Sequence, residues 1–221
     1  MLRMLNLLLA LAGTAILLLL GEFLWRKRIL KGEFARKFVH ITCATFVAFW
    51  PLFLSHYAIA AISILFVVVL VVVKKLKLFK SLRSVQRATY GEIWYALGIG
   101  VSALIFKDNA VFAVAVLTMA LADGFAAVVG VGLKKKAKVF KVQGVKKSVA
   151  GTATFILLSF LINYIYWLFF ASEPLMVNAA AISLMAAILL GFTELVSPKG
   201  SDNVIVPVMA GLLVVLPVAF S

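Results

Sequence analysis

The chain has 221 residues, of which 65% are hydrophobic and only 14% are charged, and its mean hydropathy is +1.14. About a quarter of the residues of a soluble domain are charged, so this composition excludes an ordinary soluble fold. The net charge of +14 would suggest nucleic acid in a soluble protein, but here the basic residues lie between apolar runs of about the length that crosses a bilayer. We predict an all-α polytopic membrane protein with no nucleic-acid partner.

Eight apolar segments follow one another along the chain. They cover residues 4–25, 38–54, 57–73, 92–106, 110–131, 149–170, 174–192 and 204–220. Several are short for a full crossing, so we expect tilt or half-helices and a count of about eight, within a range of seven to nine. The first segment is long for a signal peptide and lacks a clear cleavage site. Residues 1–221 are therefore predicted to form a single integral membrane domain.

The basic residues gather in alternate loops. Residues 26–37, 74–87, 134–147 and 193–203 hold 20 of the 22 lysines and arginines. With eight spans these loops share one side of the membrane, which the positive-inside rule places in the cytoplasm, with both chain termini outside. Residues 74–87 fit an amphipathic helix on anionic lipid headgroups and a solvated loop equally well.

Acidic residues are scarce and unevenly placed. Of the eight, six lie at or near the predicted cytoplasmic ends of spans: Glu22, Glu33, Glu92, Asp123, Glu194 and Asp202. Carboxylates at a bilayer are costly and usually have a partner or a function. Because carboxylates bind Mg²⁺ and basic side chains bind phosphate, a face that carries both is suited to a metal–nucleotide complex.

Asp123 stands near the predicted inner end of the fifth span and is the strongest candidate for a metal ligand. Ala126, Ala127 and Gly130 follow it on the same helix face, and their small size allows another backbone or a ligand to approach closely. Gly130 and Gly132 are expected to permit a tight exit from the helix into the basic loop.

A candidate anion site lies at the start of the sixth span. Lys146, Lys147 and Ser148 come directly before it, and Gly151 and Thr152 fall in its first turn. The free N–H groups of a helix start, together with flanking lysines, favour a phosphate group. The Walker pattern of P-loop enzymes is absent from the chain.

These patterns resemble the CTP-dependent lipid kinases, a family that includes dolichol kinases, phytol kinases and CTP-dependent diacylglycerol kinases. Four elements carry the resemblance, in order, over about residues 33–207. They are Glu33…Arg36-Lys37-x-x-His40; Tyr90-Gly91-Glu92; Ala122-Asp123-x-x-Ala126-x-x-x-Gly130 with Lys146-Lys147-Ser148-x-x-Gly151-Thr152; and Glu194 with Ser197-Pro198 and Asp202-Asn203-x-x-x-Pro207. The resemblance implies transfer of the γ-phosphate of CTP to the hydroxyl of a membrane lipid, with Mg²⁺ or another divalent cation.

The resemblance and the charge pattern together assign roles to individual residues. Predicted catalytic residues are Asp123, Glu194, Asp202 and His40, and the three acids are also the predicted metal ligands. Predicted nucleotide and phosphate ligands are Arg36, Lys37, Lys146, Lys147, Ser148, Gly151, Thr152 and Asn203. Glu33, Glu92 and Gly130 are additional candidates.

Two other functions fit parts of the sequence. A cytidylyltransferase that forms a CDP-lipid would use the same nucleotide, metal and membrane geometry, but residues 193–203 are shorter than the signature of CDP-diacylglycerol synthases. A transporter would also contain buried carboxylates, although distributed through the bilayer depth rather than at one face. The identity of the lipid alcohol, whether polyprenol, phytol or diacylglycerol, is open.

Overall fold

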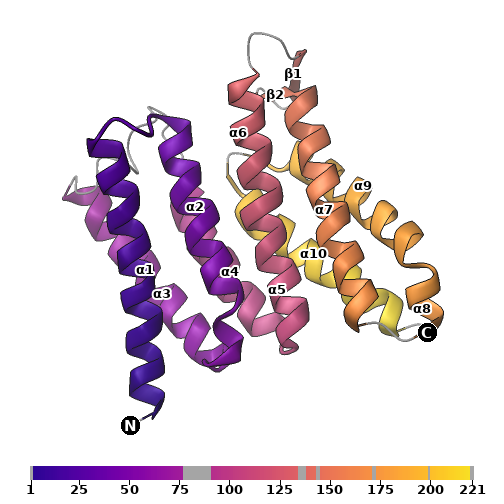
Figure 1. Cartoon of the computed structure of the whole chain (residues 1–221), viewed down its shortest axis with the longest axis horizontal. Coiled ribbons are helices and arrows are strands. Elements are labelled where there is room, and N and C mark those ends of the chain that lie inside the picture. Colours follow the sequence, from indigo (N-terminus) through magenta and orange to yellow (C-terminus); the bar gives the residue numbers. More distant parts are fainter. Residues whose placement is uncertain are drawn as a thin grey trace.

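The computed structural model describes residues 2–76, 91–133, 138–142, 145–170, 173–198 and 200–219, which form helices and one short hairpin (Figure 1). The first half of the chain contains α1 (Leu2–Arg26), α2 (Glu33–Ala48), the 3-10 turn η1 (Trp50–Leu52), α3 (His56–Lys75) and α4 (Gly91–Ile105). The second half contains α5 (Asn109–Leu117), the π-helical segment η2 (Thr118–Asp123), α6 (Gly124–Gly132), β1 (Val139–Val142), β2 (Val145–Ser148), α7 (Val149–Phe170), α8 (Glu173–Val177), α9 (Ala179–Val196) and α10 (Asp202–Ala219).

Each of the eight predicted spans falls on helix, and the all-α membrane class is confirmed. Within the described ranges, four helices are long and apolar enough to cross a bilayer: Leu2–Arg26, Asn109–Gly132, Val149–Phe170 and Ala179–Val196. Three more, His56–Val72, Gly91–Ile105 and Asp202–Val218, are apolar but shorter. Helix length thus supports a polytopic membrane protein, and the number of full crossings stays a prediction.

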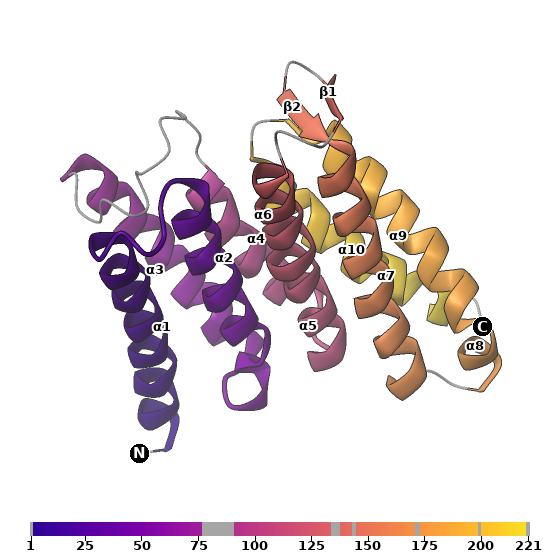
Figure 2. The same cartoon turned by 45° about the horizontal axis from the view of Figure 1, so that its top comes forward.

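The main helices run alternately up and down, so their connections gather at two ends of the bundle (Figures 1 and 2). One end, called the hairpin end here, carries β1 and β2, the connection between α1 and α2, and the turn between α9 and α10. The start of α1 and the end of α10 lie at the opposite end. The basic residues of segments 26–37 and 138–142 therefore share the hairpin end, whereas most of the basic segment 74–87 lies outside the described residues.

Several helix ends have a clear local cause. The Asp108 carboxylate accepts hydrogen bonds from the backbone N–H groups of Ala110 and Val111, both at 2.9 Å, and so caps the start of α5. Gly32, with φ of 54°, precedes α2, and Gly200, with φ of 93°, lies in the turn before α10. Both glycines occupy the left-handed region, where a side chain would be strained.

The predicted span limits differ from the observed helices in two places that matter for the site. The second span was expected over 38–54, but α2 begins at Glu33 and ends at Ala48, which places Arg36 and Lys37 inside the helix. The seventh was expected over 174–192, but it is divided into α8 and α9, and α9 continues to Val196. Hydropathy locates the apolar centre of a helix. It does not detect the polar residues that extend the helix at its end turns.

The β1–β2 hairpin is a structural element that the sequence analysis did not predict. Its strands are antiparallel, with Val139 opposite Ser148 and Lys141 opposite Lys146. α6 continues through Gly130 and ends at Gly132, and most of the basic loop that the predicted tight exit concerns lies outside the described residues. Four-residue strands within a lysine-rich segment give too short an alternation to be distinguished from a loop.

Small residues bring the helices that form the site close together. A Cβ atom added at Gly151 on α7 would lie 2.8 Å from the backbone oxygen of Ala126 on α6, so these two backbones pack directly. A Cβ at Gly98 on α4 would collide with the backbone oxygen of Asn203 on α10. The bundle around the site is therefore fixed by backbone-to-backbone contact, which leaves little freedom for the side chains it positions.

Candidate active site

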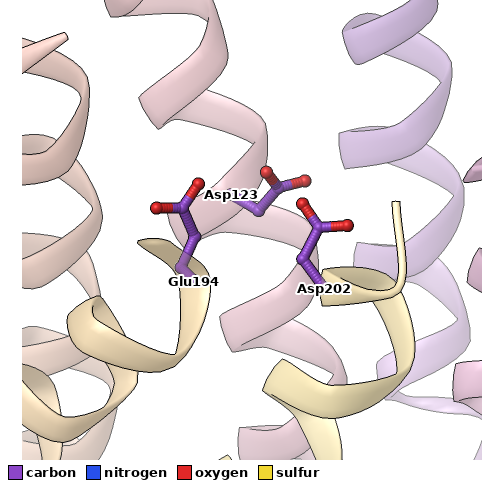
Figure 3. A group of neighbouring side chains, drawn as sticks. All are labelled: Asp123, Glu194 and Asp202. Atoms are coloured by element: carbon purple, nitrogen blue, oxygen red, sulfur yellow. The ribbon is translucent and has the colours of Figure 1, made fainter. Parts of the chain in front are cut away.

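Three carboxylates from three different helical segments meet near the hairpin end (Figure 3). Asp123 is the last residue of the π-helical segment, Glu194 lies in the last turn of α9, and Asp202 begins α10. One oxygen from each lies within 4.8 Å of those of the other two. Asp123 and Glu194 are buried and Asp202 is partly buried. The proximity that the predicted site requires is thus present.

The turn between α9 and α10 explains how Glu194 and Asp202 meet. Ser201 donates its backbone N–H to the oxygen of Pro198 at 3.0 Å, and Gly200 supplies the left-handed residue that reverses the chain. Residues eight positions apart are thereby placed side by side on two antiparallel helices. Asp123 faces them from the neighbouring central helix.

Two lysines compensate part of the negative charge. Nζ of Lys37 lies 2.5 Å from Oδ2 of Asp123 and 3.4 Å from the Asp123 backbone oxygen. Nζ of Lys147 is ion-paired with the Glu194 carboxylate and donates to the Glu194 backbone oxygen at 3.2 Å. The Lys37 side chain is only 4% exposed, so its ammonium depends on this carboxylate for its charge balance.

His40 completes the cluster on the α2 side. Its Nε2 lies 3.0 Å from the backbone oxygen of Met119 and 3.4 Å from Oδ2 of Asp123. Met119 belongs to η2, where the usual i to i+4 bonding pattern is altered, and π-helical turns often occur at functional sites. The Tyr95 ring packs against the His40 ring at a tilt of 49°, with centroids 4.7 Å apart, and the Tyr95 hydroxyl donates to the His40 backbone oxygen at 3.2 Å.

The other predicted residues of α2 and α4 lie beside His40. Arg36 is ion-paired with Glu33 one turn earlier, the pairing that their spacing allowed. Arg36 and Glu92 both line a cavity that also reaches His40. Glu33, Arg36 and Glu92 therefore form the polar border of the cluster and do not join the three carboxylates.

The hairpin separates two lysines that the sequence analysis treated alike. Lys147 points to the cluster and binds Glu194, whereas Lys146 is exposed, as expected for neighbouring residues of a strand. Ser148 is buried, and its Oγ accepts the backbone N–H of Gly151 at 3.1 Å. No contact of Lys146 with the carboxylates is found among the described residues.

Three further candidates have structural surroundings of their own. A Cβ added at Gly130 would lie 2.9 Å from Oγ of Ser148, so this glycine makes room for the start of α7. Thr152 lies in the first turn of α7 and is partly buried. Asn203 is buried, and its Nδ2 donates to the backbone oxygen of Gly91 at 3.2 Å, which ties α10 to the start of α4.

Sequence reasoning missed Tyr95 and the backbone oxygen of Met119 as parts of the site. Tyr95 lies one turn after Glu92 in an apolar helix, and nothing in its local pattern distinguishes it from a packing residue. Asp123 lies about as deep as the predicted span of 110–131 placed it, because nine residues of α6 follow it before the helix ends at Gly132. A charge so far from the helix end, and 8% exposed, does not reach water by snorkelling.

The chain is 31% identical over 201 residues to the phytol kinase of Synechocystis sp., and the match spans 88% of this chain and 84% of that protein. The chain belongs to the CTP-dependent lipid kinase family. No family model and no solved structure matches the chain. Membership makes the chain a phosphotransferase that acts on the alcohol group of a lipid and takes its phosphoryl group from a nucleotide. The transporter alternative is thereby set aside.

The donor set of the carboxylate cluster suits the divalent cation that kinases of this kind use. Mg²⁺ prefers carboxylate oxygens, and two oxygens on opposite sides of an Mg²⁺ ion lie roughly 4.2 Å apart. The observed limit of 4.8 Å is close to this value and within the range of a small side-chain rotation. Three carboxylates and two ammonium groups also leave one formal negative charge, which attracts a cation.

Proposed function

We propose that the chain transfers the γ-phosphate of CTP to the hydroxyl group of a membrane lipid alcohol, with Mg²⁺ bound by Asp123, Glu194 and Asp202. The observation that carries this proposal is the convergence of the three carboxylates within 4.8 Å, with Lys37 and Lys147 ion-paired to two of them. Phosphoryl transfer depends chiefly on positioning and on positive charge around the moving group. Bound Mg²⁺ would supply the largest part of that charge.

The phosphate side of the site is assigned to the start of α7. The Lys147 ammonium contacts Glu194 and can bind a phosphate oxygen at the same time. The hydrogen bond between Ser148 and Gly151 places the first turn of α7 beside this lysine. Thr152 lies in the same first turn of α7, whereas Lys146, exposed on the other face of β2, is not assigned a phosphate contact. Helix N-termini with adjacent lysines favour phosphate by their free N–H groups and their dipole.

The acceptor side of the site is assigned to His40 and its neighbours on α2. A carbonyl oxygen only accepts, so the contact of Nε2 with the Met119 oxygen places a hydrogen on Nε2. In a neutral imidazole Nδ1 is then an acceptor, and it is available to orient the lipid hydroxyl and take its proton. The hydroxyl oxygen bonds to the γ-phosphorus, the bond from that phosphorus to the bridging oxygen breaks, and CDP leaves with the electron pair.

The hairpin end is assigned to the cytoplasm, and both chain termini to the other side. The basic residues of the described segments 26–37 and 138–142 lie at this end, and so does the carboxylate cluster. Basic connections are retained on the cytoplasmic side of a membrane. This orientation gives a cytoplasmic nucleotide direct access to the site, and it leaves the lipid alcohol in the bilayer with its hydroxyl at the same depth.

A labelling assay tests the reaction directly. Purified protein in lipid nanodiscs is supplied with Mg²⁺, γ-labelled CTP and a panel of alcohols: phytol, on which the Synechocystis relative acts by name, then a polyprenol and diacylglycerol. We expect the label in a lipid phosphate and stoichiometric release of CDP. Label recovered only in pyrophosphate would show a cytidylyltransferase. Parallel reactions with ATP, GTP and UTP test the choice of CTP, and faster transfer from one of them would contradict it.

A further inference from the structure

An elongated cavity lies among α1, α2, α3 and α4, beside the carboxylate cluster. On the α2 side it is lined by Arg36, Val39, His40, Cys43, Val47 and, on η1, Trp50. These positions recur every three or four residues, so they form one face of the helix. The helical part of this wall runs from Arg36 to the end of α2 at Ala48, twelve steps that at 1.5 Å each give a length of about 18 Å.

The cavity is polar at one end and apolar along the rest of its length. Arg36, His40 and Glu92 lie at the hairpin end, whereas the walls beyond are made mainly of aliphatic and aromatic side chains. Hydroxyl groups in the wall are already used, because Thr14 donates to the backbone oxygen of Ala10 and Ser63 to that of Ala96. A ligand of the same shape would therefore be a hydrocarbon chain with a polar group at one end.

His40 connects the cavity to the reacting groups. The same imidazole that lines the polar end lies 3.4 Å from Oδ2 of Asp123. A hydroxyl held at this end is thus one side chain away from the carboxylate cluster. The cavity volume of about 130 Å³ is close to the roughly 150 Å³ of an engineered apolar cavity that binds benzene, so the space is large enough for hydrocarbon.

The packing of the four helices leaves a route from the bilayer. Within the described residues, α1 packs mainly on α2 and α3 packs mainly on α4, and the turn η1 joins the two pairs at the far end. The cavity lies between these pairs, and Val69, one of its lining residues, is 44% exposed. A lipid chain can enter sideways between α1 and α3 without leaving the membrane.

We infer that this cavity binds the hydrocarbon tail of the lipid alcohol, with the hydroxyl at His40 and the end of the tail near Trp50. The inference rests on the proposed kinase reaction and deepens it by locating the acceptor. The wall length of about 18 Å is close to the roughly 15 Å that one leaflet of the hydrocarbon core provides. The enclosed volume of about 130 Å³ takes up only part of a chain of that length, so the rest of the tail, and most of a long polyprenol, lies outside the cavity.

A second apolar groove supplies the competing location. It lies on the outer side of α7 and α9 and is lined by Ile156, Leu157, Phe160 and Leu184 among others. Unlike the first cavity, it is lined by none of the predicted site residues. A tail bound there would be bordered by apolar side chains alone, so nothing would hold the hydroxyl at the reacting groups.

The test compares matched variants of α3. Ile62 lines the cavity, whereas Ile64 is 61% exposed on the outer face of the same helix. We expect Ile62→Trp to raise the KM for the lipid alcohol at least tenfold and to leave CTP binding unchanged. Ile64→Trp should leave both unchanged. A third variant, Val47→Trp, fills the far end and should shift the preferred alcohol to a shorter chain.

A photo-crosslinking experiment decides the location even where a variant does not fold. Wild-type protein is irradiated with a fatty alcohol that carries a diazirine at the tail, and the labelled peptides are mapped by mass spectrometry. Labels on α2, α3 and η1 support the inference, and labels confined to α7 and α9 overturn it. If alcohols are phosphorylated but Ile62→Trp and Ile64→Trp behave alike, the tail site is wrong and the kinase reaction stands. If no alcohol is phosphorylated, the proposed function fails instead.

Discussion

At the scale of single residues, the site depends on charges held where charges are costly. Asp123 is 8% exposed inside an apolar bundle, and Lys37 is 3% exposed. A buried carboxylate and a buried ammonium are tolerated together because each neutralises the other. Both charged groups of such a pair lose their hydration, which is costly. The presence of the pair near two further carboxylates therefore indicates a functional use.

Replacement of Asp123 by asparagine tests this use. Asp123→Asn keeps the side-chain shape but removes one negative charge from the metal ligands and leaves Lys37 without its carboxylate. We expect kcat to fall by about 10²- to 10³-fold, the effect of removing one preorganised electrostatic group. Asp108→Asn is the control, because Asp108 caps α5 at the opposite end and asparagine caps equally well. Equal activity of the two variants would contradict the role of Asp123.

The two lysines of β2 provide a second comparison. Lys147 is bonded to Glu194 at the site, while its neighbour Lys146 is exposed on the other face of the strand. Lys147→Met should raise the KM for the nucleotide and lower kcat, each by roughly tenfold or more, since a charge-assisted contact contributes about 1.5–3 kcal/mol. Lys146→Met should change either constant by less than about threefold, as expected for an exposed charge. Steady-state kinetics with varied CTP separate the two cases.

The sequence predicted the members of this site better than their partners. Asp123, Glu194 and Asp202 could be grouped because scarce acids at the ends of apolar segments are informative even without a structure. The contact of Lys37 with Asp123 joins residues 86 positions apart, and no local spacing encodes it. Because this contact could not be foreseen, Lys37 was expected only to bind phosphate. Phosphate binding by Lys37 in addition to its pairing with Asp123 stays a prediction.

At the scale of the elements, the long apolar helices were predictable and the short irregular ones were not. Apolar runs located every main helix, because a helix in a bilayer satisfies its own backbone and leaves a composition signal. The π-helical segment at Thr118–Asp123 has no such signal, since residues 119–122 simply continue the apolar run between α5 and α6. It nevertheless shapes the site, because it brings the Met119 oxygen and the Asp123 carboxylate to the same ring nitrogen, Nε2, of His40.

The contact of α4 with α10 controls the position of Asp202. A Cβ at Gly98 would collide with the backbone oxygen of Asn203, the residue after Asp202. Gly98→Ala should therefore push the start of α10 away, with a loss of roughly 1–3 kcal/mol of stability and a marked loss of activity. Gly132→Ala is the matched control, because nothing lies within 4 Å of its added Cβ and alanine favours a helix. The measurement is thermal unfolding in detergent. An equal fall in the melting temperature of both variants would contradict this account.

At the scale of the whole molecule, polarity is arranged for a bilayer. Large apolar side chains are exposed around the outside of the bundle, among them Leu8 on α1, Ile64 on α3 and Phe192 on α9. Basic residues of the described segments 26–37 and 138–142 belong to the hairpin end, and Glu194 and Asp202 flank the α9–α10 turn at the same end. In lipid this arrangement buries the apolar perimeter and leaves one charged end at a membrane surface, which is where a soluble nucleotide and a lipid hydroxyl can meet.

This arrangement makes a prediction about membrane topology. Cys43, the one cysteine of the chain, is buried, so single cysteines introduced at exposed sites can be labelled against a low background. Lys146→Cys reports the hairpin end, and Ser55→Cys and Asn109→Cys report the opposite end. In right-side-out vesicles, a membrane-impermeant maleimide should label Ser55→Cys and Asn109→Cys at once and Lys146→Cys only after permeabilisation. Labelling of Lys146→Cys in sealed vesicles would place the carboxylate cluster on the outer side, away from the cytoplasmic pool of CTP, and the proposed orientation would be wrong.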